Sequence, residues 1–165
     1  MLNKKTLILF LITLTFFSFG QYVLPNEEVI FSFDTQSGKK VTLNKDKGNK
    51  YMVYRFGTKN KVELEFSDKT KNSFKQFTYS FYMRGSGAQN DGMDLNYVSF
   101  TNANYKYVIY DTYYSVANRK EIGIKVIDLK TSQPQTVKGN YTSRKGTLIN
   151  FRDNGLIGVD EILPE

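Results

Sequence analysis

The sequence predicts an all-β fold, a single-domain antiparallel β-barrel or sandwich of about eight to ten strands. Apolar and polar residues alternate with a period of two in several runs, most clearly at residues 61–66. Turn-forming residues interrupt these runs at intervals of roughly ten residues. After the first twenty residues, no stretch keeps the i, i+3, i+4 spacing of an amphipathic helix. These three observations together indicate a β-sheet protein.

Residues 1–20 predict a cleaved secretory signal peptide. Lys4-Lys5 precede an apolar run at residues 7–17, and small residues stand before a cleavage point after Gly20. The run is shorter than the ~20 apolar residues that span a bilayer. We therefore expect one all-β domain over residues 21–165 and a secreted or periplasmic location. Removing the two lysines lowers the formal net charge from +7 to +5, since the leader holds no acidic residue.

The alternating runs predict the strands in chain order. We expect strands at residues 29–34, 40–43, 51–56, 61–66, 77–84, 93–101, 105–114, 121–129, 147–151 and 156–162, with a short edge strand at 137–141. Residues 67–75 form a polar loop with room for one helical turn. The turn at residues 102–104 joins two alternating runs and indicates a hairpin.

The composition excludes several classes of chemistry. The chain contains no cysteine and no histidine. Thiol catalysis, thiolate metal sites and Ser-His-Asp triads are therefore impossible. We predict a non-enzymatic protein with no cofactor and no metal. The modest positive charge favours anionic partners in general, and export argues against nucleic acid as the partner.

Carboxylates are the remaining acid–base groups. Two of the three residues Asp91, Asp94 and Asp111 could form the carboxylate pair of a glycoside hydrolase, but nothing in the sequence sets the distance between them. Asn90, Asp91 and Asp94 supply oxygen ligands for calcium, without the spacing of an EF-hand loop. For Asp111, among tyrosines in its strand, we expect a structural hydrogen bond or ion pair.

One polar segment differs from an ordinary turn, the connection at residues 84–92 (the 84–92 loop). Three glycines in eight residues allow this loop to protrude. Ser86 offers a hydroxyl and Arg84 a guanidinium fork suited to carboxylates. The alternative is a plain, glycine-eased connection. Our candidate partner-binding residues are Arg84, Ser86, Gly87, Asn90 and Asp91.

The tract at residues 80–114 resembles the central part of bacterial exported lysozyme inhibitors, small all-β proteins that plug the active-site cleft of lysozyme. The resemblance implies that Ser86, in its Ser-Gly sequence, contacts the catalytic carboxylates of a lysozyme. It also implies that Lys106 acts as the assisting basic residue. The chain lacks the cysteines that close a disulfide in many members of that family.

Two other functions fit the residues. An envelope module that binds an anionic polysaccharide would use exposed tyrosine and lysine side chains, with Tyr113 and Lys106 as candidates. A structural subunit would pair its strand edges with a partner chain. The tyrosines of residues 105–114 lie on both faces of one strand, so some of them must be outside the core.

Overall fold

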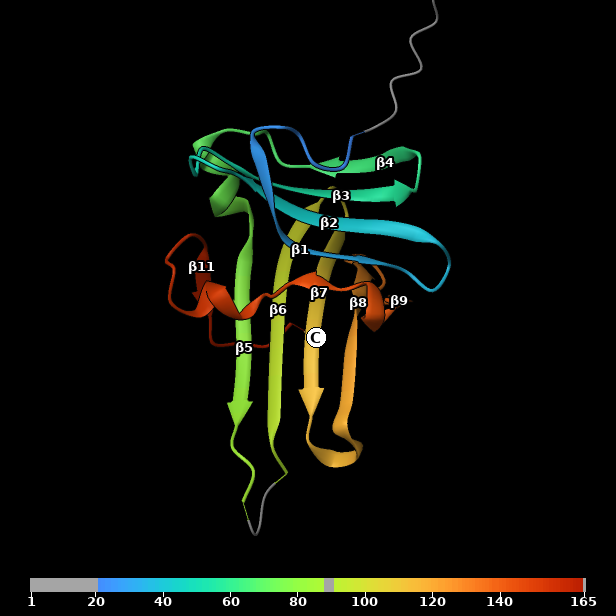
Figure 1. Cartoon of the computed structure of the whole chain (residues 1–165), viewed down its shortest axis with the longest axis vertical. Coiled ribbons are helices and arrows are strands. Elements are labelled where there is room, and N and C mark those ends of the chain that lie inside the picture. The colour runs from blue at the N-terminus through green and yellow to red at the C-terminus, as the bar shows by residue number, and fades with distance from the viewer. Residues whose placement is uncertain (1–20, 88–90, 165) are drawn as a thin grey trace, which may run out of the picture.

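The computed structural model describes residues 21–87 and 91–164, and the predicted signal peptide lies outside them. These residues form a β-sandwich of two sheets, which confirms the predicted all-β class (Figure 1). The first sheet contains β1 (Glu27–Asp34), β2 (Lys39–Asp46), β3 (Met52–Thr58), β4 (Lys61–Phe66) and β10 (Lys145–Gly146), in the order β10-β1-β2-β3-β4.

The second sheet is larger and has the order β11-β5-β6-β7-β8-β9. Its strands are β5 (Thr78–Arg84), β6 (Met93–Asn102), β7 (Tyr105–Tyr114), β8 (Arg119–Asp128), β9 (Pro134–Lys138) and β11 (Gly158–Asp160). Four short 3-10 helices connect the strands: η1 (Lys71–Gln76), η2 (Val116–Asn118), η3 (Tyr141–Ser143) and η4 (Ile149–Arg152). The helical turn expected within residues 67–75 corresponds to η1, and the predicted hairpin at 102–104 joins β6 to β7.

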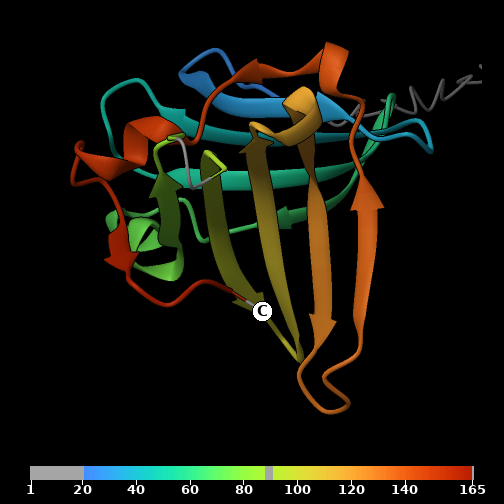
Figure 2. The same ribbon diagram turned by 90° about the horizontal axis from the view of Figure 1, so that it is seen from below.

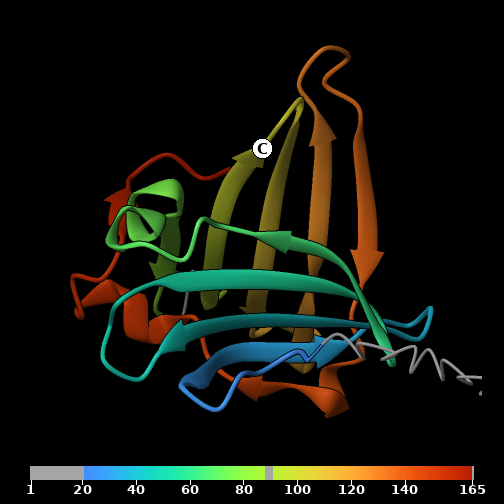
Figure 3. The same cartoon turned by 90° about the horizontal axis from the view of Figure 1, so that it is seen from above.

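An apolar core fills the space between the two layers, which Figures 2 and 3 show separately. Alternate residues of the strands face it, as the period of two predicts. Phe66 stacks on Phe100 with ring centroids 4.2 Å apart, and Phe100 stacks on Tyr107 at 4.9 Å. Burying each such side chain contributes about 1.5–3 kcal/mol, so the core suffices without disulfides.

The segment at residues 139–157, which we call the closing segment, differs from the expectation. Residues 147–151 form no strand. Leu148 and Phe151 are both buried, and the 3-10 turn η4 places residues three apart on the same side. The strand expected at 156–162 is reduced to β11, which pairs parallel to β5, so the sheet is not purely antiparallel.

The edge strand predicted at 137–141 corresponds to β9, which lies a few residues earlier in the chain, at Pro134–Lys138. β9 ends at Lys138, and a β-carbon at the next residue, Gly139, would lie 2.7 Å from side-chain atoms of Ile122 and Phe33, so only glycine fits there. The closing segment then crosses the core-facing side of the second sheet (Figure 1). The strands β5 to β8 extend beyond the first sheet at the end that carries the 84–92 loop.

Candidate functional site

The described residues of the 84–92 loop, 84–87 and 91–92, lie at the ends of β5 and β6 that point away from the first sheet (Figure 1). Its base is fixed by a reciprocal pair of hydrogen bonds: the Gly92 amide donates to Ser115 Oγ at 2.8 Å, and the Ser115 amide donates to the Gly92 carbonyl at 2.9 Å. Ser86 and Gly87 are exposed. Asn90 lies outside the described residues. The loop therefore presents Ser86 to solvent on an anchored base.

Arg84 holds this base together. Its Nε donates to the Asp91 carbonyl oxygen at 2.8 Å, across the mouth of the loop. The guanidinium nitrogens of the fork remain able to bind an anion, while the Asp91 carboxylate stays exposed. The structure thus brings Arg84 and Asp91 together as neighbours at the loop base.

The two supporting residues lie elsewhere. Lys106 pairs with Thr101 near the far end of β7, whereas Tyr113 pairs with Asp94 near the end that adjoins the loop. The two residues are seven positions apart along β7, which corresponds to about 23 Å. Because seven is an odd number, their side chains lie on opposite faces of the strand. Lys106 is therefore not brought to Ser86 as the basic partner that the family resemblance implies.

The carboxylates of β6 and β7 are paired with arginines from the closing segment. Asp111 Oδ2 accepts hydrogen bonds from Arg144 Nε at 3.1 Å and Nη2 at 2.7 Å, which confirms the expected structural ion pair. Asp94 Oδ1 accepts a hydrogen bond from Arg152 Nη2. Burial raises the pKa of Asp111; the hydrogen bonds from Arg144 oppose this shift, and the charge of Asp94 adds to it. The described residues contain no group of three or more potential acidic metal ligands.

Asp94, Asp111 and Arg144 line a cleft of about 320 Å³ on the core-facing side of the second sheet, beside the closing segment (the inner cleft). Tyr113 of β7, Asn118 of η2 and Lys120 of β8 belong to its wall. Its lining is Asp94, Asn96, Asp111, Thr112, Tyr113, Asn118, Lys120, Tyr141, Arg144 and Ile149.

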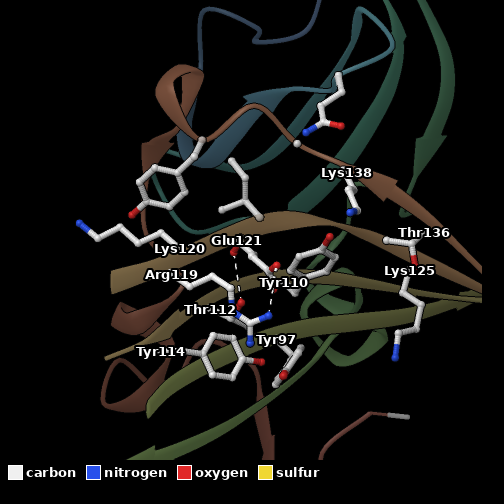
Figure 4. Close-up of a pocket in the computed structure, with 14 residues that line it drawn as sticks. Tyr97, Tyr110, Thr112, Tyr114, Arg119, Lys120, Glu121, Lys125, Thr136 and Lys138 are labelled. Atoms are coloured by element: carbon white, nitrogen blue, oxygen red, sulfur yellow. Dashed lines mark hydrogen bonds and ion pairs between the residues drawn. The ribbon is translucent and has the colours of Figure 1, made fainter. Parts of the chain in front are cut away.

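The opposite side of the same strands carries a second cleft, of about 480 Å³, which the sequence reasoning did not find (the outer cleft; Figure 4). Its lining is Gln36, Tyr97, Tyr110, Thr112, Tyr114, Arg119, Lys120, Glu121, Ile122, Lys125, Thr136, Lys138, Gly139 and Tyr141. Four strands, β6, β7, β8 and β9, supply the cations and all the tyrosines except Tyr141, which belongs to η3. Four cationic side chains face a single carboxylate, that of Glu121.

The cations lie at the two ends of the outer cleft. Arg119 and Lys120 stand at one end and Lys125 and Lys138 at the other, with Tyr97 and Tyr110 between them (Figure 4). Six residues of β8 separate Arg119 from Lys125, which corresponds to about 20 Å. An elongated anion would therefore meet positive charge at both ends and aromatic rings in the middle.

A glycine on β8 shapes the floor of the outer cleft. A β-carbon at Gly123 would lie 2.3 Å from the Tyr110 hydroxyl and 2.5 Å from the Val137 carbonyl oxygen. Tyr110 can lie across β8 only because position 123 has no side chain. The residue opposite Tyr110 in the strand pairing is this same glycine.

The electrostatics of the outer cleft favour the protonated forms of Tyr97 and Tyr110. Burial, with smaller effects from Tyr114 and Glu121, raises the pKa of Tyr97 to about 12. Burial and then the charge of Glu121 raise the pKa of Tyr110 as well. Both hydroxyls are therefore available as hydrogen-bond donors at neutral pH. Arg119 stacks 4.1 Å above the Tyr114 ring centroid, which holds its charge at the cleft mouth.

The alternation of the tyrosines was the available signal for this cleft. Tyr97, Tyr110 and Tyr114 lie on one face once β6 and β7 are aligned by pairing Tyr97 with Tyr110. Whether the charged side chains of β8 lie beside these tyrosines depends on a second register, that of β7 against β8. Local spacing along the sequence does not specify this register.

No family model, curated protein or solved structure matches the chain. Among the described residues, no helix is long and apolar enough to cross a membrane. The fold and the clefts define a β-sandwich with an aromatic, cationic groove on one side of its larger sheet and a carboxylate-lined groove on the other.

Proposed function

We propose that this chain is an exported, non-enzymatic binding module that takes an anionic polysaccharide into the outer cleft. The observation that carries this proposal is the convergence of Tyr97, Tyr110 and Tyr114 with four cations against one carboxylate. Aromatic faces stack on sugar rings, phenols donate to sugar hydroxyls, and cations pair with uronate or sulfate groups. The predicted signal peptide would deliver the protein to a compartment where such polymers occur.

Electrostatic attraction makes a specific prediction for this cleft. Replacing Lys125 and Lys138 together with alanine should weaken binding of polygalacturonate by at least about tenfold, because each charge-assisted hydrogen bond contributes about 1.5–3 kcal/mol. Isothermal titration calorimetry at low and high salt measures this, and added salt should weaken the wild-type complex.

The matched control is Lys59→Ala with Lys130→Ala, which removes the same charge from two exposed positions outside the cleft. If both double variants lose affinity equally, attraction by net charge explains the binding and the cleft does not. Retention of neutral dextran as strongly as polygalacturonate would also contradict the proposal.

A second candidate function rests on the exposed position of the 84–92 loop. An anchored loop with Ser86 and Arg84 suits insertion into an acidic cleft, which is the mode that the resemblance to lysozyme inhibitors implies. The family's disulfide is absent from this chain, so the loop relies on Ser115 and Arg84 for its shape.

This function predicts that the purified mature protein slows lysozyme turnover at micromolar concentration. Replacing Arg84 and Ser86 with alanine should raise the inhibition constant by at least about tenfold, since two hydrogen bonds to charged groups are lost. Thr101→Ala, at the opposite end of β6, is the control and should inhibit as the wild type does. Full activity of several lysozyme classes in the presence of the protein would exclude this function.

A further inference from the structure

The outer and inner clefts meet at one edge of the second sheet. β9 pairs with residues Gly123 to Ile127 of β8, and the first residues of β8 have no strand on that side among the described residues. The chain leaves β9 through Gly139, whose amide donates to the Ile122 carbonyl at 2.8 Å. The start of β8 is therefore an open edge between the two faces of the sheet.

Three residues line both clefts: Thr112, Lys120 and Tyr141. Lys120 belongs to the open part of β8, and its Nζ lies 5.9 Å from the Tyr141 ring centroid. The two clefts therefore adjoin at the β8 edge, one on each side of these side chains, and we call the pair the groove. The volumes of about 480 and 320 Å³ each lie in the lower half of the range of ligand pockets, ~300–1,000 Å³.

The two halves of the groove differ in charge. The outer half carries the excess of cations described above, whereas the inner half sets Asp94 and Asp111 against their partners Arg152 and Arg144, with Lys120 at the boundary of the two halves. Only one oxygen of each inner carboxylate is engaged within the described part of the chain: Asp111 Oδ2 with Arg144, and Asp94 Oδ1 with Arg152 and Asn96. The second oxygens are acceptors for hydroxyl or amide donors.

We propose that the ligand is a linear oligosaccharide that crosses the β8 edge, with an acidic sugar in the outer cleft and an uncharged, hydroxyl-rich or N-acetylated sugar in the inner cleft. This inference rests on the proposed polysaccharide function and specifies its ligand as a chain of mixed charge. A uniformly anionic chain would gain less attraction in the inner half, where Asp94 and Asp111 offset the charges of the arginines that bind them. A disaccharide is shorter than the outer cleft, whose cationic ends lie about 20 Å apart, and would occupy that half alone.

Hyaluronan fragments test the groove, because a uronate alternates with an uncharged N-acetyl hexosamine along their length. The disaccharide, tetrasaccharide and hexasaccharide are titrated into the mature protein by calorimetry, with polygalacturonate fragments of equal length as the uniformly charged series. Affinity for hyaluronan fragments should rise at least about tenfold from disaccharide to hexasaccharide, as the second half of the groove adds about 1.4 kcal/mol or more. The polygalacturonate series should gain less with length.

The variant Tyr113→Ala opens the wall of the inner cleft. It should remove the gain with length and leave disaccharide affinity unchanged. Tyr105→Ala is the matched control, since both tyrosines belong to β7 and are exposed to similar extents, 37% for Tyr113 and 43% for Tyr105. Lys120→Glu, at the point where the chain crosses the edge, should reduce hexasaccharide affinity more than disaccharide affinity.

The outcomes separate the two proposals. If affinity does not depend on length and Tyr113→Ala has no effect, while Lys125→Ala with Lys138→Ala abolishes binding, the polysaccharide function stands and the wrapped groove is wrong. If the polygalacturonate series gains as much with length as the hyaluronan series, the mixed-charge ligand is wrong. If no probe binds, the polysaccharide function is wrong, and so is the proposal of a ligand that crosses the β8 edge.

Discussion

At the scale of single residues, Gly123 has the clearest effect on the candidate site. The Tyr110 ring crosses β8 where any side chain at this position would stand, and Tyr110 forms the middle of the outer cleft. The strand pattern alone treats a glycine here as a weak point in β8. The structure gives it a positive role, because it makes room for a tyrosine from the neighbouring strand.

Gly123→Ala should therefore displace Tyr110 and strain the β8–β9 pairing at the Val137 carbonyl. We expect a loss of about 1–3 kcal/mol in the free energy of unfolding from overpacking, and polysaccharide affinity weaker by up to about tenfold through the lost aromatic contact. Denaturant titration and calorimetry measure the two effects. Gly158→Ala is the control, since a β-carbon there meets no atom within 4 Å. Equal effects of both substitutions would refute this role of Gly123.

At the scale of elements, the closing segment is held to the second sheet by two arginines. Arg152 donates to Asp94 and, at 2.8 Å, to Asn96 Oδ1, and its guanidinium carbon lies 4.8 Å from the Phe81 ring centroid. Arg144 makes the matching contact with Asp111. Leu148, Phe151 and Ile157 bury their side chains in the core between and beyond these contacts. The segment thus has an apolar anchor and two polar ones.

Arg152→Met should loosen η4 and β11 without unfolding the sandwich. It leaves Asp94 and Asn96 partly unpaired, which we expect to cost about 1–3 kcal/mol. Hydrogen exchange should become faster for amides of residues 149–160 and stay unchanged in β2 and β3. Lys130→Met, on the exposed loop before β9, serves as the control. Uniformly faster exchange across both sheets would mean that the segment is not a separate cooperative unit.

At the scale of the whole molecule, buried charge on the first sheet links stability to pH. Arg55 pairs with Glu27 at 2.6 Å, and their side chains are 1% and 0% exposed. Burial alone would raise the pKa of Glu27, but hydrogen bonds from Arg55, the Leu24 amide and Tyr51 outweigh it and lower the pKa. Glu65 behaves similarly: hydrogen bonds from Lys69 and Arg55 lower its pKa against the effect of burial.

A carboxyl whose pKa is lower in the folded state stabilises the fold above its unfolded pKa, about 4.3 for glutamate, and loses this contribution as pH falls through the folded value. Asp111 has a raised pKa and acts in the opposite direction, so its effect partly offsets that of the two glutamates. We expect the free energy of unfolding to fall between about pH 5 and pH 2, measured by urea titration. Glu27→Gln should flatten this dependence, whereas Glu161→Gln, on an exposed residue, should not. Stability that rises on acidification would contradict the pairing.

The strands could be predicted because alternation is a local property. Eight of the expected runs coincide with β1 to β8, since each has an apolar face that the period of two reveals. The run at 137–141 shares only Val137 and Lys138 with β9, which has no buried residue. The other exceptions lie at 147–151, in the closing segment, and at 156–162, at its end. There, contacts with distant strands decide the backbone: Leu148 and Phe151 reach the core through a 3-10 turn, and β11 finds the open edge of β5.

By itself, the sequence determined the all-β class, the absence of thiol and histidine chemistry, the 84–92 loop and the existence of tyrosines outside the core. Only the tertiary structure decided which of those tyrosines meet which charges. Tyr113 and Lys106, candidates for one surface, lie about 23 Å apart along β7 on opposite faces. Tyr97, Tyr110, Arg119 and Lys125 come together instead. The reason is physical: side-chain period is set within a strand, but register and sheet order depend on contacts between strands far apart in the chain.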